Sequence, residues 1–188
     1  MELLAIGLGV DRMLYREFFE DAVSIMRTNL YPTCQEPNRS HGTGPHCDPN
    51  ALTILHQDLV GGLDLFVDNK WHKVRPIPGA LVINIGDVFA NALSNGIYRS
   101  CLHRAVVNSH KERRSLVFFM CPRADKLVKP AKELVRTSEG AQESFWISHG
   151  QICLNSLKTI TELMKLLSKT SPTGSFLLII PIPNPPNN

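Results

Sequence analysis

Short apolar runs separated by turn residues fill the middle of the chain, and this pattern predicts strands rather than helices. Gly61-Gly62, Asp68-Asn69-Lys70 and Asn95-Gly96 are typical of turns between such runs. The expected strands cover 51–56, 63–67, 71–74, 80–85, 98–107 and 115–120. Their close, even spacing without a helical period between them predicts a mainly β fold, a double-stranded β-helix (jelly-roll) core with flanking helices.

Both ends of the chain differ from this middle part. Residues 1–27 place apolar side chains at helical spacing, which predicts an N-terminal helical segment that packs on the core. We therefore expect the jelly-roll core to span 28–135, with a charged, loop-like stretch at 126–135. The last part, 136–188, contains an amphipathic helix expected at 152–167 and an apolar tail to which the sequence assigns no role.

Composition narrows the class of protein. A chain of 188 residues with 43% hydrophobic residues has room for one full core. The net charge of +3 is too small to predict a nucleic-acid partner. Five cysteines without C-x-x-C spacing favour free thiols in a reducing compartment. No stretch approaches the ~20 apolar residues of a membrane span, so we expect a soluble, cytoplasmic monomer without a membrane partner.

The candidate chemistry begins at His46 and Asp48. Successive side chains of an extended strand point to opposite faces, so these two emerge on the same side. With the distant His103 they form a 2-His-1-carboxylate set, the type that binds non-haem Fe(II) and leaves coordination positions open. A jelly roll can bring the two histidines together. The sequence therefore predicts an iron site made of His46, Asp48 and His103.

Arg113 and Ser115 are two residues apart where the last expected strand begins, so in extended chain they share one face. A guanidinium and a hydroxyl placed side by side suit a carboxylate, such as the distal carboxylate of 2-oxoglutarate. Iron ligands followed by Arg-x-Ser on an apolar strand form a more specific signal than His-x-Asp alone.

Other residues offer less specific readings. Cys47 lies between two expected ligands and suggests a zinc site, but strand alternation directs its thiol to the opposite face, where core packing is expected. His56 is an alternative metal ligand or a partly buried strand residue. Asp87, after Gly86, is expected to cap a turn.

The motifs that surround these residues resemble those of plant 2-oxoglutarate/Fe(II) dioxygenases, and among them the gibberellin 20-oxidases. The Cys between the two expected ligands points to this branch. The resemblance runs from about Leu3 to Val135. It rests on Asn29-Leu30-Tyr31-Pro32-Thr33-Cys34-Gln35, Gly42-Thr43-Gly44-Pro45-His46-Cys47-Asp48-Pro49, Leu52-Thr53-Ile54-Leu55-His56-Gln57-Asp58, Asn84-Ile85-Gly86-Asp87 and Ser100-Cys101-Leu102-His103-Arg104-Ala105-Val106-Val107-Asn108-Ser109.

This resemblance implies an enzyme that uses Fe(II), 2-oxoglutarate and O2, with ascorbate as reductant. The implied substrate is a twenty-carbon gibberellin, a small diterpenoid, oxidised stepwise at carbon 20 in gibberellin biosynthesis. The iron ligands would be His46, Asp48 and His103. The cosubstrate residues would be Arg113 and Ser115, with Tyr31 and Asn29 beside them.

Departures from the family pattern leave alternatives open. The family's N-terminal half is absent, and residues 136–188 no longer resemble its C-terminal segment. The turn at 87–93 is one residue longer than in the family, which predicts a disturbed approach to His103. The same chemistry on another small plant metabolite, or a catalytically inactive jelly-roll fragment that binds a metal or a partner, are therefore rival hypotheses.

Overall fold

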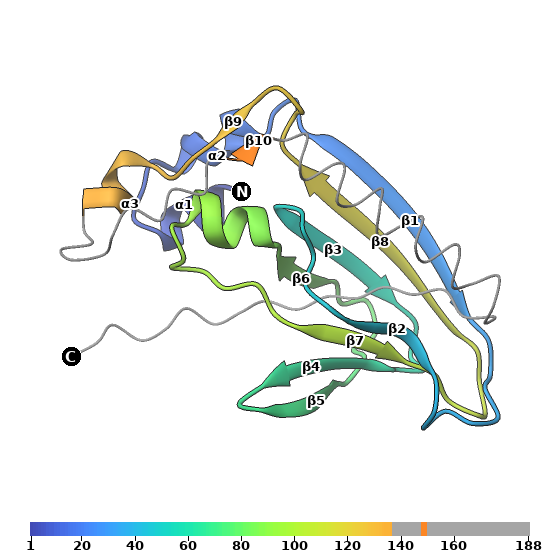
Figure 1. Ribbon diagram of the computed structural model, residues 1–188. Coiled ribbons are helices and arrows are strands. Elements are labelled where there is room, and N and C mark those ends of the chain that lie inside the picture. The colour runs from blue at the N-terminus through green and yellow to red at the C-terminus, as the bar shows by residue number, and fades with distance from the viewer. Residues whose placement is uncertain (137–147, 150–188) are drawn as a thin grey trace.

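The computed structural model describes residues 1–136 and 148–149. Two four-stranded antiparallel sheets form its centre and face each other across a shared interior (Figure 1). The first has the order β1-β8-β3-β6, with bounds Val23–Tyr31 (β1), Arg113–Cys121 (β8), Leu52–Gln57 (β3) and Val82–Ile85 (β6). The second has the order β2-β7-β4-β5, with bounds His41–His46 (β2), His103–Val106 (β7), Leu63–Val67 (β4) and Lys70–Val74 (β5). The predicted mainly β jelly roll is confirmed.

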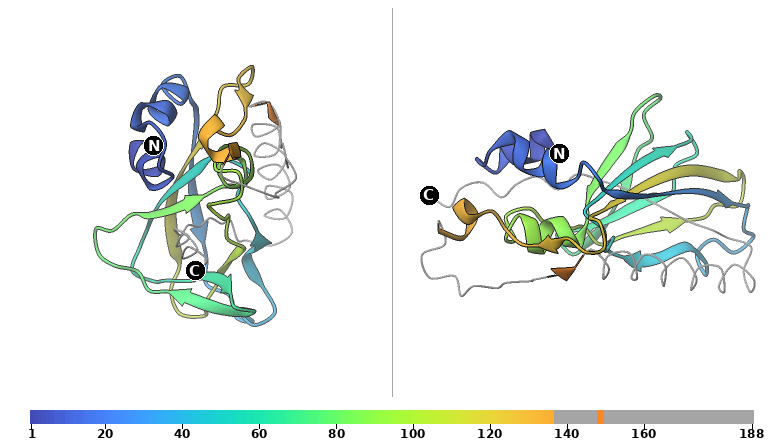
Figure 2. Two further views of the ribbon diagram at one scale, coloured as in Figure 1. Left: turned by 90° about the vertical axis from the view of Figure 1, so that its left-hand side faces the viewer. Right: turned by 90° about the horizontal axis from the view of Figure 1, so that it is seen from above.

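Two short helices, Glu2–Gly7 (α1) and Arg12–Phe18 (α2), lie beyond one end of the strands (Figure 2). The side chain of Asp11 caps α2 by accepting a hydrogen bond from the backbone N–H of Met13, at 2.8 Å. The helical segment therefore ends earlier than the expected 1–27, because β1 already begins at Val23. Side chains of β1 alternate between core and solvent, and this period of two is that of a strand and not of a helix.

The chain after β8 is less loop-like than expected. Leu127–Val128 (β9) pairs with Ser148–His149 (β10), and Lys132–Arg136 (α3) forms one helical turn. The expected strand 98–107 is also too long, since only His103–Val106 has ladder partners. The helix and the apolar tail expected within 136–188 lie outside the described residues. Of this range the structure describes only residue 136, at the end of α3, and β10. Among the described helices, none is long and apolar enough to cross a membrane.

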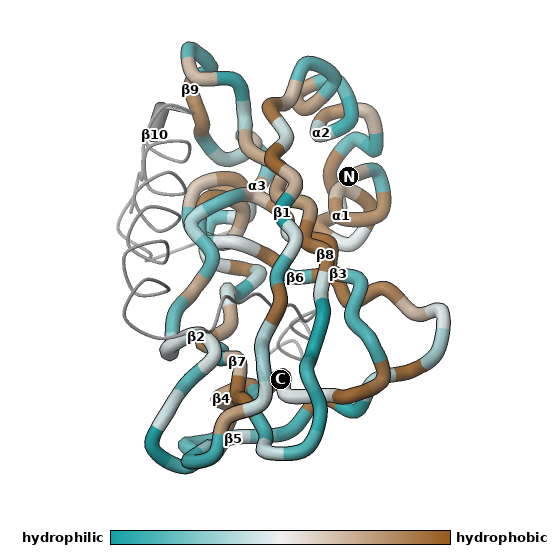
Figure 3. Tube along the Cα trace, turned by 90° about the vertical axis from the view of Figure 1, so that its right-hand side faces the viewer, coloured by the Kyte–Doolittle hydropathy of each residue, from teal (hydrophilic) through white to brown (hydrophobic). Residues whose placement is uncertain are grey.

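Hydrophobic segments gather where the first sheet meets the helices, and hydrophilic segments dominate the far end of the two sheets (Figure 3). The main core there joins Ala5 and Tyr15 of the helices to Leu55, Phe89 and Val117. A separate small cluster, made of Tyr31, Ala105 and Val107, lies between the sheets. This second cluster belongs to the candidate site.

Val88–Leu93 forms a π-helix (η1). This segment was expected to be a turn one residue longer than in the family, and a π-helix has more residues per turn than an α-helix. The N–H of Ser94 donates to the carbonyl of Phe89 at 2.8 Å, five residues earlier, and the Ser94 hydroxyl donates to the carbonyl of Ala90 at 2.7 Å. Five of the six side chains of η1 are buried. Asp87 lies at its N-cap without a side-chain capping bond, so the expected capping role is wrong. His103 begins β7 and pairs with His46, so the expected disturbance of its approach is not observed.

The cysteine expectation holds in part. Cys34, Cys47 and Cys101 are free thiols, each half-buried. Cys121, fully buried at the end of β8, is instead disulfide-bonded, which corrects the prediction of free thiols throughout.

Candidate metal and cosubstrate site

Strand pairing brings the two histidines together. His46, the last residue of β2, is the register partner of His103, the first residue of β7. Their rings meet edge to face with centroids 4.2 Å apart, and the two Nε2 atoms are 3.0 Å apart. Residues far apart in the sequence are thus joined at one place by the ladder.

Backbone carbonyls fix how each ring is protonated. Nδ1 of His46 lies 2.8 Å from the carbonyl oxygen of Gly44, and Nδ1 of His103 lies 2.8 Å from that of Cys101. Since a carbonyl only accepts, each Nδ1 carries a hydrogen, and in the neutral form of such a ring the lone pair lies on Nε2. Two lone pairs that face each other at this distance repel, so the arrangement favours a cation shared between them.

Asp48 completes the set from the chain just after β2. One of its oxygens, Oδ1, lies 3.7 Å from Nε2 of His46 and 3.6 Å from Nε2 of His103. In the described part of the chain, His46, Asp48 and His103 form a group that could hold a metal ion. Their donor atoms all lie within 4.8 Å of one another. Two imidazoles and one carboxylate form the donor set that suits non-haem iron. The donor set therefore fits Fe(II), and the predicted trio does converge.

The second oxygen of Asp48 is held by the protein. Oδ2 accepts hydrogen bonds from the Thr53 hydroxyl at 2.7 Å and from the Asn84 amide at 3.2 Å. The Asn50 amide in turn donates to Thr53 Oγ1 at 2.9 Å. All four side chains are almost fully buried. Such partners orient a ligand and raise its affinity for metal.

The start of η1 packs against the loop that carries Asp48. The N–H of Asp87 donates to the carbonyl of Asp48 at 2.8 Å, and the N–H of Val88 donates to that of Asn50 at 3.1 Å. A Cβ at Gly86 would lie only 2.0 Å from the Asn50 carbonyl oxygen, so this close approach requires glycine. Thr53, Asn50 and Asn84 were missed by the sequence analysis. The available signal was a polar residue inside each of two otherwise apolar strands.

Burial lowers the pKa of His103 to about 4, although the Asp48 carboxylate beside it acts in the opposite direction. His103 is therefore neutral near pH 7. A neutral imidazole is the form that binds a metal, because protonation would occupy the donating Nε2.

Arg113 is the largest fully buried side chain of the described residues, at 1% exposure. Its Nη2 donates to the side-chain oxygen of Gln57 at 3.0 Å, while Nε and Nη1 have no hydrogen-bond partner in the parts of the chain that the structure describes. No carboxylate is paired with it within those ranges. A buried cation with two unsatisfied donors is costly unless an anion binds to it. Arg113 thus fits a carboxylate ligand.

Tyr31 lies beside Arg113 because the two are register partners on β1 and β8. The guanidinium carbon is 4.9 Å from the centre of the Tyr31 ring, a cation–π contact. The Tyr31 hydroxyl is buried and has no hydrogen-bond partner among the described residues. Burial raises the pKa of Tyr31, so this hydroxyl stays protonated and can donate to an anion.

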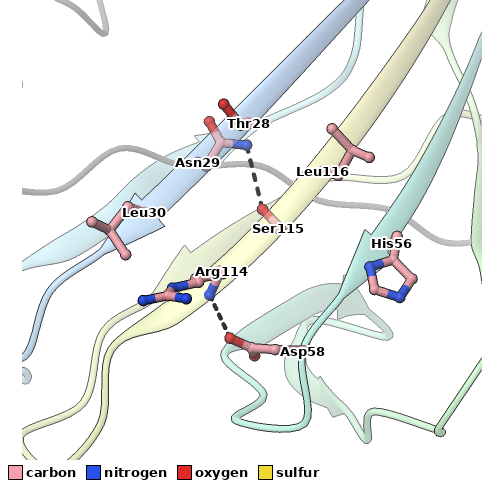
Figure 4. Close-up of a pocket in the computed structure, with 8 residues that line it drawn as sticks. All are labelled: Thr28, Asn29, Leu30, His56, Asp58, Arg114, Ser115 and Leu116. Atoms are coloured by element: carbon pink, nitrogen blue, oxygen red, sulfur yellow. Dashed lines mark hydrogen bonds between the residues drawn. The ribbon is translucent and has the colours of Figure 1, made fainter.

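Asn29 and Ser115 form the neighbouring register pair. The Asn29 amide nitrogen donates to Ser115 Oγ at 3.3 Å (Figure 4). Asn29, Tyr31, Arg113 and Ser115, the four residues expected at the cosubstrate, therefore all point to the interior side of β1 and β8.

The opposite face of the same strands carries different side chains. A hollow of about 490 Å³ there is lined by Thr28, Leu30, His56, Asp58, Arg114 and Leu116, and Asn29 and Ser115 also border it (Figure 4). His56 is exposed on β3 and takes no part in the metal set, so the alternative metal role is wrong for this residue. Cys47 is half-buried and not part of that set either.

Comparison with known proteins identifies the family. Residues 22–122 match the model of the 2OG-Fe(II) oxygenase superfamily. The chain belongs to the 2OG-Fe(II) oxygenase superfamily. Fe(II) and 2-oxoglutarate are the metal and cosubstrate from which this superfamily takes its name, and the donor set and the buried Arg113 fit both.

Curated relatives within this superfamily are gibberellin 20-oxidases, as the sequence motifs predicted. Gibberellin 20 oxidase 2 of Oryza sativa subsp. indica is 67% identical over 130 residues, which cover 69% of this chain and 33% of the relative. Gibberellin 20 oxidase 4 of Arabidopsis thaliana is 52% identical over 173 residues, covering 88% and 45%. The chain thus spans between a third and a half of the length of these relatives.

Solved structures of oxygenases share the fold. A crystal structure of JOX2 in complex with 2OG, Fe and JA has a TM-score of 0.74 at 33% identity, covering 95% of this chain and 49% of that one. The 2-oxoglutarate complex of dioxygenase for auxin oxidation 1 from Arabidopsis thaliana has a TM-score of 0.64 at 30% identity, covering 71% and 50%. Both support the jelly-roll assignment.

Proposed function

We propose that this chain is an Fe(II)- and 2-oxoglutarate-dependent dioxygenase that oxidises carbon 20 of gibberellin precursors. The observation that carries the proposal is that the space between the sheets contains both a set of metal donors and a buried arginine that suits a carboxylate. A His-Asp-His donor set lies at one end of β2 and β7, and the buried Arg113 lies further along the space between the sheets. The identity of 52–67% to gibberellin 20-oxidases favours that substrate class.

In this proposal the metal ligands are His46, Asp48 and His103. Asp48 supplies negative charge through Oδ1, while Thr53 and Asn84 hold Oδ2 and keep the carboxylate oriented. The neutral Nε2 lone pairs of the two histidines point into the same space. These residues leave further coordination positions available to other ligands.

The cosubstrate residues in this proposal are Arg113, Ser115, Tyr31 and Asn29. Arg113 binds the distal carboxylate of 2-oxoglutarate through Nε and Nη1, and the Tyr31 hydroxyl donates to the same group. Asn29 positions Ser115. Burial of all four side chains excludes water, which strengthens each of these charge-assisted contacts.

When bound, Fe(II) and 2-oxoglutarate supply the oxidation: O2 delivers one oxygen atom to the substrate and one to succinate, with loss of CO2. Ascorbate is the proposed reductant that keeps the iron ferrous. We also propose that the protein acts as a monomer in the cytoplasm on a small diterpenoid, without nucleic-acid or membrane partners.

Two rival functions have specific support. The solved relatives named for JA and for auxin oxidation favour the same chemistry on another small plant metabolite. The short span relative to the gibberellin 20-oxidases favours a fragment that binds iron and 2-oxoglutarate without turnover. The gibberellin 20-oxidases are 52–67% identical to this chain, against 30–33% for these two solved structures, which is why the gibberellin substrate is proposed first.

The deciding experiment incubates the full chain with Fe(II), ascorbate, 2-oxoglutarate and a twenty-carbon gibberellin, and measures succinate and oxidised gibberellin by mass spectrometry. The proposal expects succinate and oxidised gibberellin to increase together. Succinate without oxidised gibberellin would favour a different substrate. Folded protein that binds Fe(II) and 2-oxoglutarate but forms neither product would favour the inactive fragment.

A further inference from the structure

Gly42 on β2 faces the ring of Tyr31 across the space between the two sheets. A Cβ at position 42 would lie 2.6 Å from Cδ1 and 2.7 Å from Cε1 of Tyr31, and 3.3 Å from the carbonyl oxygen of Ala105. The two distances to the Tyr31 ring are far shorter than van der Waals contact between carbon atoms. We propose that Gly42 is a positioning residue for the cosubstrate: its missing side chain lets Tyr31 lie where it contacts both Arg113 and the bound carboxylate.

Backbone conformation is not the reason for this glycine. Gly9, Gly61, Gly62, Gly79 and Gly96 have positive φ angles, where other residues are strained, but Gly42 is not among them. Alanine can adopt the backbone of position 42. The obstacle to alanine is space, because its Cβ would clash with the ring of Tyr31.

The Tyr31 ring has nowhere to move. It is 1% exposed and packs in a small cluster with Ala105 and Val107. Its other neighbour is the guanidinium of Arg113. A methyl group at position 42 would therefore push the ring toward Arg113 instead of toward solvent, because close-packed interiors transmit such displacements.

Arg113 is enclosed on a further side by a second glycine. A Cβ at Gly62 would lie 3.2 Å from Cδ of Arg113 and 2.6 Å from the carbonyl oxygen of Val106. The guanidinium thus lies between Tyr31 and the Gly62 turn and has little freedom to yield. A shift of the Tyr31 ring is expected to displace Nε and Nη1, the two donors that no group of the described residues satisfies.

Recognition of a carboxylate by a guanidinium and a hydroxyl tolerates displacements of only about 0.5 Å. Gly42→Ala is therefore expected to weaken 2-oxoglutarate binding while it leaves the iron ligands unaffected. This inference rests on the proposed role of Arg113 and Tyr31 in 2-oxoglutarate binding. It adds a residue that touches neither the cosubstrate nor the metal.

The test compares Gly42→Ala with Gly7→Ala, a matched control outside the site. A Cβ at Gly7 would lie 2.3 Å from the Tyr98 hydroxyl, so both variants introduce a methyl group against a tyrosine. Iron affinity is measured by anaerobic titration. The affinity of the iron-loaded protein for 2-oxoglutarate is measured by calorimetry and by the visible absorption band of the chelate. We expect Gly42→Ala to lose at least about tenfold in 2-oxoglutarate affinity, with iron affinity unchanged, and Gly7→Ala to lose none.

A second pair of variants shows whether the methyl group acts through Tyr31. Tyr31→Leu removes the ring, so adding Gly42→Ala to it should cause no further loss of 2-oxoglutarate affinity. This pair also decides the matter if Gly42→Ala alone does not fold, because the leucine relieves the clash.

Three results would overturn the proposal: unchanged 2-oxoglutarate affinity in folded Gly42→Ala, a parallel loss of iron affinity, or a further loss in the Tyr31→Leu background. Wild-type protein that binds iron but not 2-oxoglutarate would instead refute the proposed function itself.

Discussion

The two ends of the candidate site differ in how their polar atoms are satisfied. At the metal end, Asp48 Oδ2 and both histidine Nδ1 atoms have partners from the protein. At the Arg113 end, Nε and Nη1 of Arg113 and the Tyr31 hydroxyl have none within the described residues. Within the described residues, the protein itself orients the metal ligands, whereas the polar atoms at the Arg113 end are left for a ligand, which we propose is an anion.

This difference has an energetic consequence. Unpaired buried polar atoms cost free energy in the folded state, so the Arg113 end reduces the stability of the ligand-free protein and recovers that cost on binding. The metal end contributes hydrogen bonds whether or not iron is bound. Substitutions at the two ends should therefore differ in stability as well as in function.

Removing a metal ligand should have the largest effect. His46→Ala or His103→Ala removes one of only three protein ligands, and we expect Fe(II) affinity to fall by more than ~100-fold, with turnover lost. Anaerobic iron titration measures this directly. His56→Ala, an exposed histidine on β3, serves as the control and should bind iron as wild type does. Iron binding that survives in both ligand variants would refute the metal assignment.

Arg113→Leu should have the next largest effect, on 2-oxoglutarate. Loss of a buried charge pair costs about 3–5 kcal/mol, which corresponds to roughly 100-fold to several thousand-fold in affinity. The ligand-free variant should be at least as stable as wild type, because an unpaired buried cation is replaced by an apolar group. Calorimetry with 2-oxoglutarate and thermal unfolding without it measure the two effects.

The matched control for that substitution is Arg114→Leu. Arg114 is the next residue on β8, but it is exposed on the opposite face of the sheet (Figure 4). It should leave 2-oxoglutarate affinity unchanged. An equal loss in both variants, or a clear loss of stability in Arg113→Leu alone, would contradict the view that this end is completed by the ligand.

Thr53→Val should have a smaller effect, confined to the metal end. The substitution keeps the shape of the side chain and removes the hydroxyl that donates to Asp48 Oδ2. Loss of such a supporting contact costs about 10–100-fold in metal affinity. The affinity of the iron-saturated protein for 2-oxoglutarate should not change. Thr28→Val, on the exposed side of β1, is the control, and unchanged iron affinity in Thr53→Val would remove Thr53 from the site.

Much of this site could be predicted from the sequence because its residues obey strand alternation. Arg113 and Ser115 are spaced by two on β8, so the strand puts both on one side. For His46 and Asp48 the expectation reached the right result by another route, because β2 ends at His46 and Asp48 approaches from the chain just after it. Strand pairing then needed only the jelly-roll topology to bring His103 to His46. The four proposed cosubstrate residues lie together because of two ladder steps, Asn29 with Ser115 and Tyr31 with Arg113.

What the sequence could not provide depends on contacts between elements. The bond from Asn84 on β6 to Asp48 and the close approach of Gly42 to Tyr31 join segments with no local pattern in common. The sequence also contained no sign that 88–93 forms a π-helix, because that conformation depends on buried contacts of η1. The helical segment was extended to residue 27, although Ser24 to Arg27 already have strand character and β1 begins at Val23.

Asn29→Ala should have the smallest effect of the series. Asn29 is expected to act through Ser115, by one neutral hydrogen bond of 3.3 Å. Such a bond is worth about 1 kcal/mol, so 2-oxoglutarate affinity should fall roughly fivefold. Asn38→Ala, an exposed asparagine between β1 and β2, is the control.

A loss in Asn29→Ala as large as that in Arg113→Leu would mean that Asn29 contacts the cosubstrate directly. Its side-chain oxygen, which also has no partner among the described residues, would then belong with the atoms that a ligand satisfies. A small loss would instead place Asn29 with Thr53, as a residue that orients a neighbour. The protein would then orient Asn29 and Ser115 by itself. Of the proposed cosubstrate residues, only Arg113 and Tyr31 would differ from the metal ligands in having polar atoms that await a ligand.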